Sequence, residues 1–147
     1  MPDNFVDTNV FFYAYDDRDS GRQQRSRLWI EAISDLQIGV ANLQVANEFT
    51  SVVLRRMPNL PADTVFQIAD NILSWGTGSV TVQTTTKARE IRKALRYSRW
   101  DCLLLASALE LGCSHFLSED LQDGHRIESL TIIDPFAHSP DQILALR

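Results

Sequence analysis

Four acidic residues, far apart along the chain, are the side chains most suited to chemistry: Asp7, Glu48, Asp101 and Asp120. Two of them follow short apolar runs that predict buried strands, and two lie in apolar helical segments. In open α/β sheets ligands bind beyond the carboxyl ends of the strands, so such acids can meet in one cleft. Carboxylates that meet repel one another unless cations neutralise them. Oxygen ligands without His or Cys favour Mg²⁺ or Mn²⁺, which can activate water to hydrolyse a phosphodiester.

Each of the four acids also has a purely structural interpretation. Asp7 can cap the turn after a strand, and Asp101 can favour a helix dipole from the first turn. Glu48 can be a solvated helix residue, and Asp120 can be a helix N-cap. Only their convergence in the fold distinguishes these interpretations from a shared metal site.

Basic residues gather just before Asp101, where six of the 14 Lys and Arg residues lie: Lys87, Arg89, Arg92, Lys93, Arg96 and Arg99. The i, i+3, i+4, i+7 spacing of residues 89, 92, 93 and 96 predicts one helix face. That face is either a solvated surface or a binding surface for the phosphates of RNA. The second interpretation reconciles a nucleic-acid substrate with a net charge of −5, since an acidic protein on average repels phosphate. Cations that could extend such a surface are Arg22, Arg25, Arg55 and Arg56.

Other site types lack their motifs. The sequence has no Walker A loop, no G-x-G-x-x-G, no H-E-x-x-H and no G-x-S-x-G. Cys102 and Cys113 are expected to be buried free thiols in a reducing compartment. The N-terminus lacks the features of a signal peptide, and the longest apolar run, residues 102–106, is too short to cross a membrane. We therefore expect a cytoplasmic protein without membrane contact.

Strand-like and helix-like segments alternate along 147 residues, 44% of them hydrophobic, and predict one α/β domain over residues 1–147. An apolar segment covers residues 10–15. The expected strands are residues 5–6, 38–40, 80–82, 114–117 and 130–133. The expected helices are residues 20–36, 43–57, 61–75, 86–97, 100–111 and a short one from 140. This alternation favours a parallel sheet with helices on both faces.

Four motifs in this order resemble those of the PIN-domain family: Phe5-Val6-Asp7-Thr8-Asn9-Val10, Gln44-Val45-Ala46-Asn47-Glu48-Phe49, Ser98-Arg99-Trp100-Asp101, and Phe116-Leu117-Ser118-Glu119-Asp120-Leu121-Gln122-Asp123-Gly124. The closing Ile132-Ile133-Asp134-Pro135-Phe136 is similar to the last strand and turn of that family. The resemblance covers essentially the whole chain. It implies a three-layer α/β/α sandwich with a mainly parallel sheet, and metal-dependent ribonuclease activity.

The resemblance also implies roles for individual residues. Its acidic set falls on Asp7, Glu48, Asp101 and Asp120 as catalytic ligands of Mg²⁺, for which Mn²⁺ can substitute. Asp7 and Asp101 are expected to hold the principal ion, and the other two complete the shell or bind a second one. Residues that match positions orienting the carboxylates are Thr8, Asn9, Ser118 and, less directly, Asp123. The basic residues Arg89, Arg92, Lys93, Arg96 and Arg99 are expected to bind RNA.

At this length the chain most resembles the VapC-type toxins of toxin–antitoxin systems. That resemblance implies a homodimer that a small antitoxin protein holds inactive by blocking the cleft. Two other functions stay open. One is a catalytically silent PIN-like module that binds RNA or protein, and the other is a Mg²⁺-dependent phosphatase of small phosphoesters.

Overall fold

The computed structural model describes residues 3–76 and 80–144. Its helices and strands follow one another as β1 (Asn4–Val6), α1 (Thr8–Ala14), α2 (Ser20–Leu36), β2 (Gly39–Val40), α3 (Leu43–Arg56), α4 (Ala62–Leu73), α5 (Val82–Ala94), α6 (Arg99–Glu110), β3 (His115–Leu117), β4 (Arg126–Ile127), β5 (Leu130–Ile133) and α7 (Pro140–Leu144). The expected α/β class is confirmed.

Within the described residues, five strands form one sheet in the order β2-β1-β3-β5-β4. Only β4 is antiparallel to its neighbour, so the sheet is mainly parallel, as predicted. The central strands β1 and β3 are in register, with Val6 opposite Leu117. Both strands therefore end at the same edge of the sheet, and the residues that follow them, Asp7 and Ser118, lie side by side.

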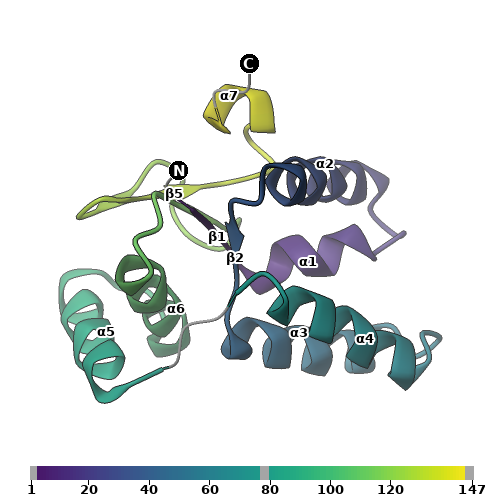
Figure 1. Ribbon diagram of the computed structural model, residues 1–147, viewed down its shortest axis with the longest axis horizontal. Helices are drawn as coiled ribbons and strands as arrows, with labels where there is room; N and C mark the ends of the chain where they lie inside the picture. The colour runs from purple at the N-terminus through teal and green to yellow at the C-terminus, as the bar shows by residue number, and fades with distance from the viewer. Residues whose placement is uncertain (1–2, 77–79, 145–147) are drawn as a thin grey trace.

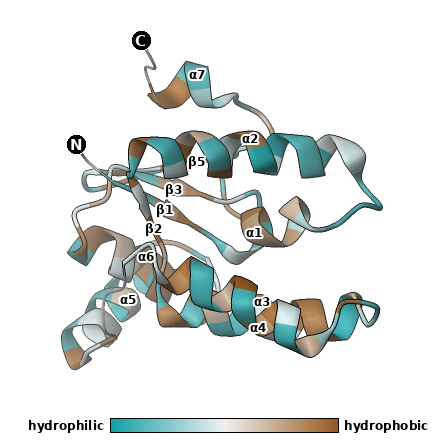
Figure 2. Cartoon of the chain, turned by 45° about the vertical axis from the view of Figure 1, so that its right-hand side comes forward, coloured by the Kyte–Doolittle hydropathy of each residue, from teal (hydrophilic) through white to brown (hydrophobic). Residues whose placement is uncertain are grey.

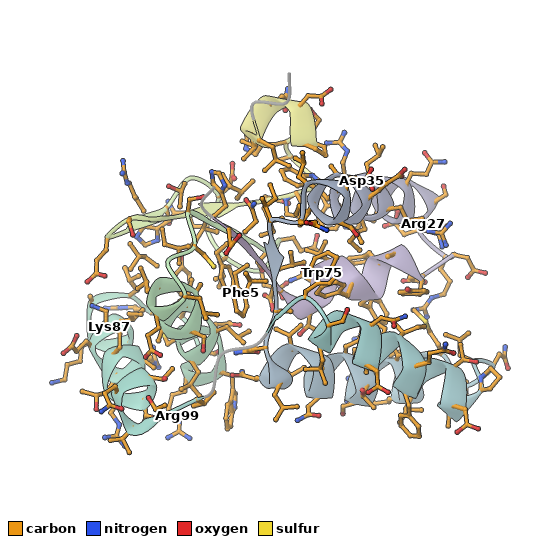
Figure 3. The ribbon with its side chains drawn as sticks, in the orientation of Figure 1. Phe5, Arg27, Asp35, Trp75, Lys87 and Arg99 are labelled. Carbon is orange, nitrogen blue, oxygen red and sulfur yellow. The ribbon has the colours of Figure 1, made fainter. Side chains whose placement is uncertain are left out.

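The sheet lies between two layers of helices (Figures 1 and 2), in the three-layer arrangement that the resemblance implies. Helices α2 and α7 cover one side, and the α3–α4 and α5–α6 pairs lie on the other. The core between them is aromatic at its centre, where the rings of Phe5 and Phe116 stack with centroids 5.3 Å apart. Phe5 lies deep in the molecule, whereas Lys87 and Arg99 lie at its periphery (Figure 3).

The predicted strand over residues 80–82 is wrong. Thr81 is instead the N-cap of α5, which begins at Val82. β-Branched residues favour strands in general, but here the Thr81 hydroxyl accepts from the Thr84 N–H while the Thr84 side chain accepts from the Thr81 N–H. This reciprocal capping box starts a helix where the residue types alone predict a strand.

The basic helix expected over residues 86–97 is therefore displaced toward the N-terminus. It ends at Ala94, because Leu95 is extended, with φ −126° and ψ 146°. Arg89, Arg92 and Lys93 lie on α5, but Arg96 lies in the loop before α6 and Arg99 is the first residue of α6. The predicted four-residue basic stripe on one helix is thus wrong at Arg96.

Other differences concern short elements. Strand β4 was not expected, and it turns back to β5 through Glu128 with a left-handed φ of 54°. Asp120 lies in a turn rather than at a helix N-terminus, so its interpretation as an N-cap is wrong. Cys102 and Cys113 are buried free thiols, as expected. No helix in the described parts of the chain has the length and apolar character to cross a membrane.

Candidate active site

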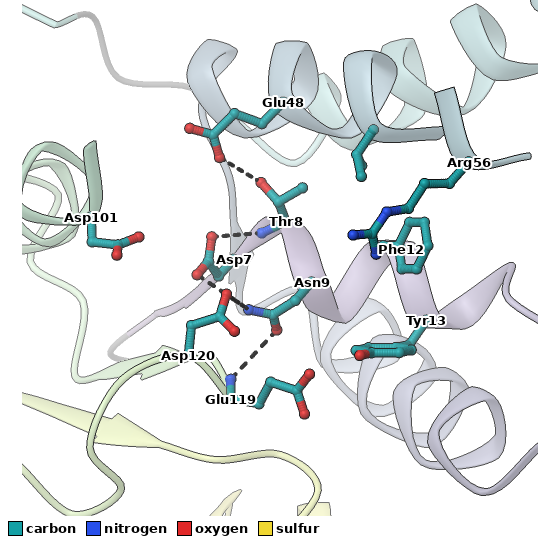
Figure 4. Close-up of a pocket in the computed structure, with 11 residues that line it drawn as sticks. Asp7, Thr8, Asn9, Phe12, Tyr13, Glu48, Arg56, Asp101, Glu119 and Asp120 are labelled. Atoms are coloured by element: carbon teal, nitrogen blue, oxygen red, sulfur yellow. Dashed lines mark hydrogen bonds between the residues drawn. The ribbon is translucent and has the colours of Figure 1, made fainter. Parts of the chain in front are cut away.

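The fold brings all four predicted acids to one pocket of about 390 Å³ (Figure 4). Asp7 follows β1, Glu48 lies on α3, Asp101 on α6 and Asp120 in the turn after β3. Thr8 and Asn9, two of the residues expected to orient the carboxylates, also line the pocket. Residues separated by 41, 53 and 19 positions in the sequence therefore meet at the predicted edge of the sheet.

Asp7 is the most buried of the four acids, with 3% of its surface exposed. It is the N-cap of α1, and its carboxylate accepts from the backbone N–H of Thr8 at 2.7 Å. The carboxylate also accepts from the Ser118 hydroxyl at 2.8 Å. Burial, together with the negative charges of Asp101 and Glu48, raises the pKa of Asp7 to about 7, against the effect of the two hydrogen bonds. Asp7 therefore caps a helix and also lines the pocket with the other acids, so its structural and its functional interpretation both hold.

Ser118 and Asn9 connect Asp7 to Asp120. The fully buried Ser118 hydroxyl donates to Asp7 and accepts from the Asn9 amide at 3.1 Å and from the Asp120 N–H at 3.2 Å. The same Asn9 amide donates to the Asp120 carboxylate at 3.0 Å and lies 3.4 Å from Asp7. Two polar side chains thereby hold two carboxylates from distant segments in one orientation.

Glu48 is held from two sides. The Thr8 hydroxyl donates to one oxygen of its carboxylate at 3.0 Å, and the Gln44 amide donates to the other at 2.9 Å. Gln44 lies one turn before Glu48 on α3, and its amide also lies 3.2 Å from the carbonyl oxygen of Trp100. Gln44 therefore links α3 to the first turn of α6. Of its two contacts, the i, i+4 spacing could have suggested only the one with Glu48.

Asp101 is half-buried. It lies in the first turn of α6, which is the position that its helix-dipole interpretation requires. The N-cap Ser98 accepts from the Asp101 N–H at 3.1 Å and donates to its carboxylate at 2.9 Å. Burial raises the pKa of Asp101, as do the charges of Asp120 and Glu48, against the bond from Ser98. The negative charges of Glu48 and Asp120 thus act on Asp101 across the pocket.

The opposite wall of the pocket holds residues that were not expected to line it: Phe12, Tyr13, Val52, Arg56 and Glu119. Arg22 forms an ion pair with Glu119 at 3.0 Å and lies over the Tyr13 ring, so it fixes this wall from α2. Arg56 brings a positive charge to the rim, with its guanidinium 5.8 Å from the centre of the Phe12 ring. Among these wall residues, Glu119 is the one that the sequence could have indicated, because it directly precedes Asp120.

The donor set fits a hard divalent cation in chemistry, because it consists of carboxylate oxygens from four segments. Among residues 3–76 and 80–144, no three His, Cys, Asp or Glu side chains are close enough together to hold one ion as they stand. The acids line the pocket in an open arrangement. A bound cation would favour the ionised form of Asp7, whose pKa burial raises to about 7.

Asp123 and the basic residues lie elsewhere. Asp123 is exposed, accepts from the Asp134 N–H at 2.9 Å and pairs with His138 at 2.7 Å, so it orders the segment after β5. Arg89, Arg92, Lys93 and Arg99 line a separate groove between α5 and α6, and Arg96 is not among the residues lining it. Neither Asp123 nor these basic residues line the pocket that the four acids share.

Replacing Ser118 with Ala is expected to weaken the site without unfolding the chain. The change removes the 2.8 Å hydrogen bond to Asp7, so it raises the pKa of Asp7 further and leaves Asn9 without one partner. Loss of such orienting bonds typically lowers metal affinity about 10–100-fold. Titration of Mn²⁺ binding by calorimetry at pH 7.5 measures this, with Ser107→Ala, another buried serine, as the control. Equal Mn²⁺ affinity in Ser118→Ala and the wild type would contradict the role assigned to Ser118.

Comparison with known proteins agrees with the geometry of the pocket. The family model described as "PIN domain" matches residues 5–123, which include all four acids. The solved structure of VapBC2 from Rickettsia felis, bound to a DNA fragment from its promoter, resembles this chain with a TM-score of 0.60 and 15% sequence identity. The similarity covers 88% of this chain and 96% of that one. No curated protein matches the sequence. The family match spans most of the chain and contains the acidic pocket, so this protein belongs to the PIN domain family.

Proposed function

We propose that this protein is a Mg²⁺- or Mn²⁺-dependent endoribonuclease, and that it is the toxin of a cytoplasmic toxin–antitoxin pair. The observation that carries the proposal is the convergence of Asp7, Glu48, Asp101 and Asp120 on one pocket, with Asp7 buried at the end of β1. Burying a carboxylate among three others costs stability unless it binds something positive. Such a cost is typical of a functional site rather than of a structural one.

In this proposal Asp7 and Asp101 hold the principal ion, with Glu48 and Asp120 as further ligands. The ion would supply a Lewis acid and an activated water for hydrolysis of an RNA phosphodiester. The chain itself orients the ligands: Ser118 and the Thr8 N–H hold Asp7, and Ser98 holds Asp101. Thr8 and Gln44 hold Glu48, and Asn9 holds Asp120. No side chain becomes bonded to phosphorus.

The toxin assignment is supported by the likeness in fold to the VapBC2 structure from Rickettsia felis. A small antitoxin would have to cover the pocket, and two copies of the chain would form a dimer. The product of a small neighbouring reading frame, added to the purified protein, is expected to block cleavage of RNA. The Arg56 charge at the pocket rim is available to an acidic segment of such a partner or to an RNA phosphate.

Cleavage of a structured RNA pool tests the enzymatic part of the proposal. With Mg²⁺ or Mn²⁺ the protein is expected to cut RNA, and EDTA or Asp101→Asn is expected to reduce the rate at least about 100-fold. The matched control is Asp63→Asn, which changes an exposed acid in the first turn of α4 and should cleave normally.

Three results would contradict the assignment. Full activity of Asp101→Asn would remove Asp101 from the site. Binding of RNA without cleavage, by protein with a native circular dichroism spectrum, would favour a catalytically silent module. Turnover of a chromogenic phosphomonoester without RNA cleavage would favour the phosphatase.

A further inference from the structure

A second hollow lies beside the acidic pocket, between α5 and α6, with a volume of about 540 Å³. Its surface is mostly apolar and includes Ala88 and Leu103. Trp100, in the first turn of α6, forms one wall, and 61% of this side chain is exposed. A large aromatic ring left this accessible can bind a flat apolar group by stacking.

The rim of the groove is strongly basic. Four cations surround the apolar surface: Arg89, Arg92, Lys93 and Arg99. None of the four takes part in an ion pair with any residue of the described ranges, whereas Lys87 on the same helix pairs with Glu90 and Glu128. Their charge is therefore available to an anion, and the Arg99 guanidinium lies 6.0 Å from the centre of the Trp100 ring.

The groove is joined to the acidic pocket through the first turn of α6. Trp100 directly precedes Asp101, and the Trp100 carbonyl lies within hydrogen-bond distance of Gln44, which also holds Glu48. The groove residue Trp100 is therefore the sequence neighbour of Asp101 and is linked to Glu48 through Gln44. Apolar stacking surface, unpaired cations and adjacency to the acids are three properties that one ligand must match.

We propose that this groove binds a nucleobase of single-stranded RNA next to the scissile phosphodiester. The base stacks on Trp100, and phosphates on either side of it contact Arg92, Lys93 and Arg99. This inference rests on the proposed function, because it names how the same site holds its substrate. A nucleotide fits the groove better than a free phosphate, which would leave the apolar surface uncovered. It also fits better than double-stranded RNA, whose bases are stacked on one another and cannot reach Trp100.

Binding is measured without cleavage, in EDTA, with a single-stranded RNA of about 12 nucleotides. Trp100→Leu keeps the apolar character but removes the aromatic face, so affinity should fall about 10-fold or more. Trp100→Phe should retain most of the affinity. The matched control is Phe66→Leu, which changes an aromatic residue of α4 that is 47% exposed, and it should bind as the wild type does. Circular dichroism checks that each variant is folded.

Two further measurements separate stacking from charge. RNA should quench the fluorescence of the wild type, and the quenching should disappear in Trp100→Phe. Of the other two tryptophans, Trp29 is fully buried and Trp75 lines a different hollow, with Ile33 and Gly39. An RNA with one abasic position should lose affinity for the wild type but not further for Trp100→Leu. Exchange of Arg92 and Lys93 for Ala should reduce the slope of log K against log salt by about 0.7 for each phosphate that the protein no longer neutralises.

The results distinguish this inference from the proposed function. Trp100-dependent binding by a protein that does not cleave RNA would support the groove and contradict the nuclease. Metal-dependent cleavage with Trp100→Leu equal to the wild type in affinity would support the nuclease and overturn the groove. Failure of any RNA to bind would overturn it as well. So would a Trp100→Leu protein that binds RNA normally but sediments as a smaller species, since a second copy of the chain would then occupy the groove.

Discussion

Asp7→Asn is expected to make the metal-free protein more stable above pH 7 and, at the same time, to abolish cleavage of RNA. The wild-type carboxyl is 3% exposed and its pKa is raised from 3.8 to about 7. Between these two pH values the folded protein keeps a proton that the unfolded chain releases. The stability of the wild type therefore falls as pH rises from about 4 to 7, and the lost free energy of unfolding is about 2–4 kcal/mol.

Asparagine keeps the shape of the side chain and carries no charge. Its amide oxygen can still accept from the Thr8 N–H. Its NH₂ group then faces the Ser118 hydroxyl, which must release either the Asn9 amide or the Asp120 N–H in order to accept from it. Urea unfolding in EDTA measures the effect: the variant should exceed the wild type at pH 8, and the difference should vanish near pH 4. Asp70→Asn, an exposed acid on α4, is the control and should show no such difference. If Asp7→Asn were less stable than the wild type at pH 8, the ionised carboxylate would stabilise the metal-free fold, and the prediction would be wrong.

Phe116→Ala is expected to cost about 3–5 kcal/mol of the free energy of unfolding, a large part of the total for a domain of this size. Phe116 is fully buried in β3 and stacks on Phe5 of β1, with an angle of 5° between the rings. The truncation leaves a cavity between the two strands that carry Asp7 and Ser118 at their ends. The site should therefore lose activity together with stability.

Thermal unfolding followed by circular dichroism measures this effect. Phe66→Ala removes the same side chain from a position that is 47% exposed, and it should change stability by less than about 0.5 kcal/mol. A Phe116→Ala protein as stable as the Phe66→Ala control would mean that the centre of the sheet can collapse to fill the cavity.

The sequence predicted the meeting of the four acids in one pocket better than it predicted the elements around them. Asp7 and Asp120 follow apolar runs, and strands read from such runs place them at one edge of a parallel sheet. Glu48 and Asp101 lie on helices, and only the ordered family motifs placed them in the same pocket. The local donors Thr8, Asn9 and Ser118 came from the same resemblance.

Local hydrogen bonds override the residue types where the structure differs most from the sequence-based prediction. Residues 80–82 are of strand-forming types, but the reciprocal Thr81–Thr84 bonds begin a helix there. At its other end the helix stops at Ala94, because Leu95 is extended, and Arg96 therefore lies outside it. Tyr13 was missed, and Arg22 and Arg56 were expected only to extend a basic surface. Their relation to the acids arises from packing across the pocket, which has no signature in the sequence.

The register between the two central strands has a consequence for when the candidate site forms. Strand β1 pairs with residues 115–117, and Asp7 bonds to Ser118 across 111 positions. Such contacts demand closure of a long loop, so they form late compared with the helices, whose contacts are local. A chain interrupted before residue 115 lacks one neighbour of β1, as well as Ser118 and Asp120. The acidic pocket can therefore form only once the chain extends past Asp120. No single helix or hairpin contains all of its residues.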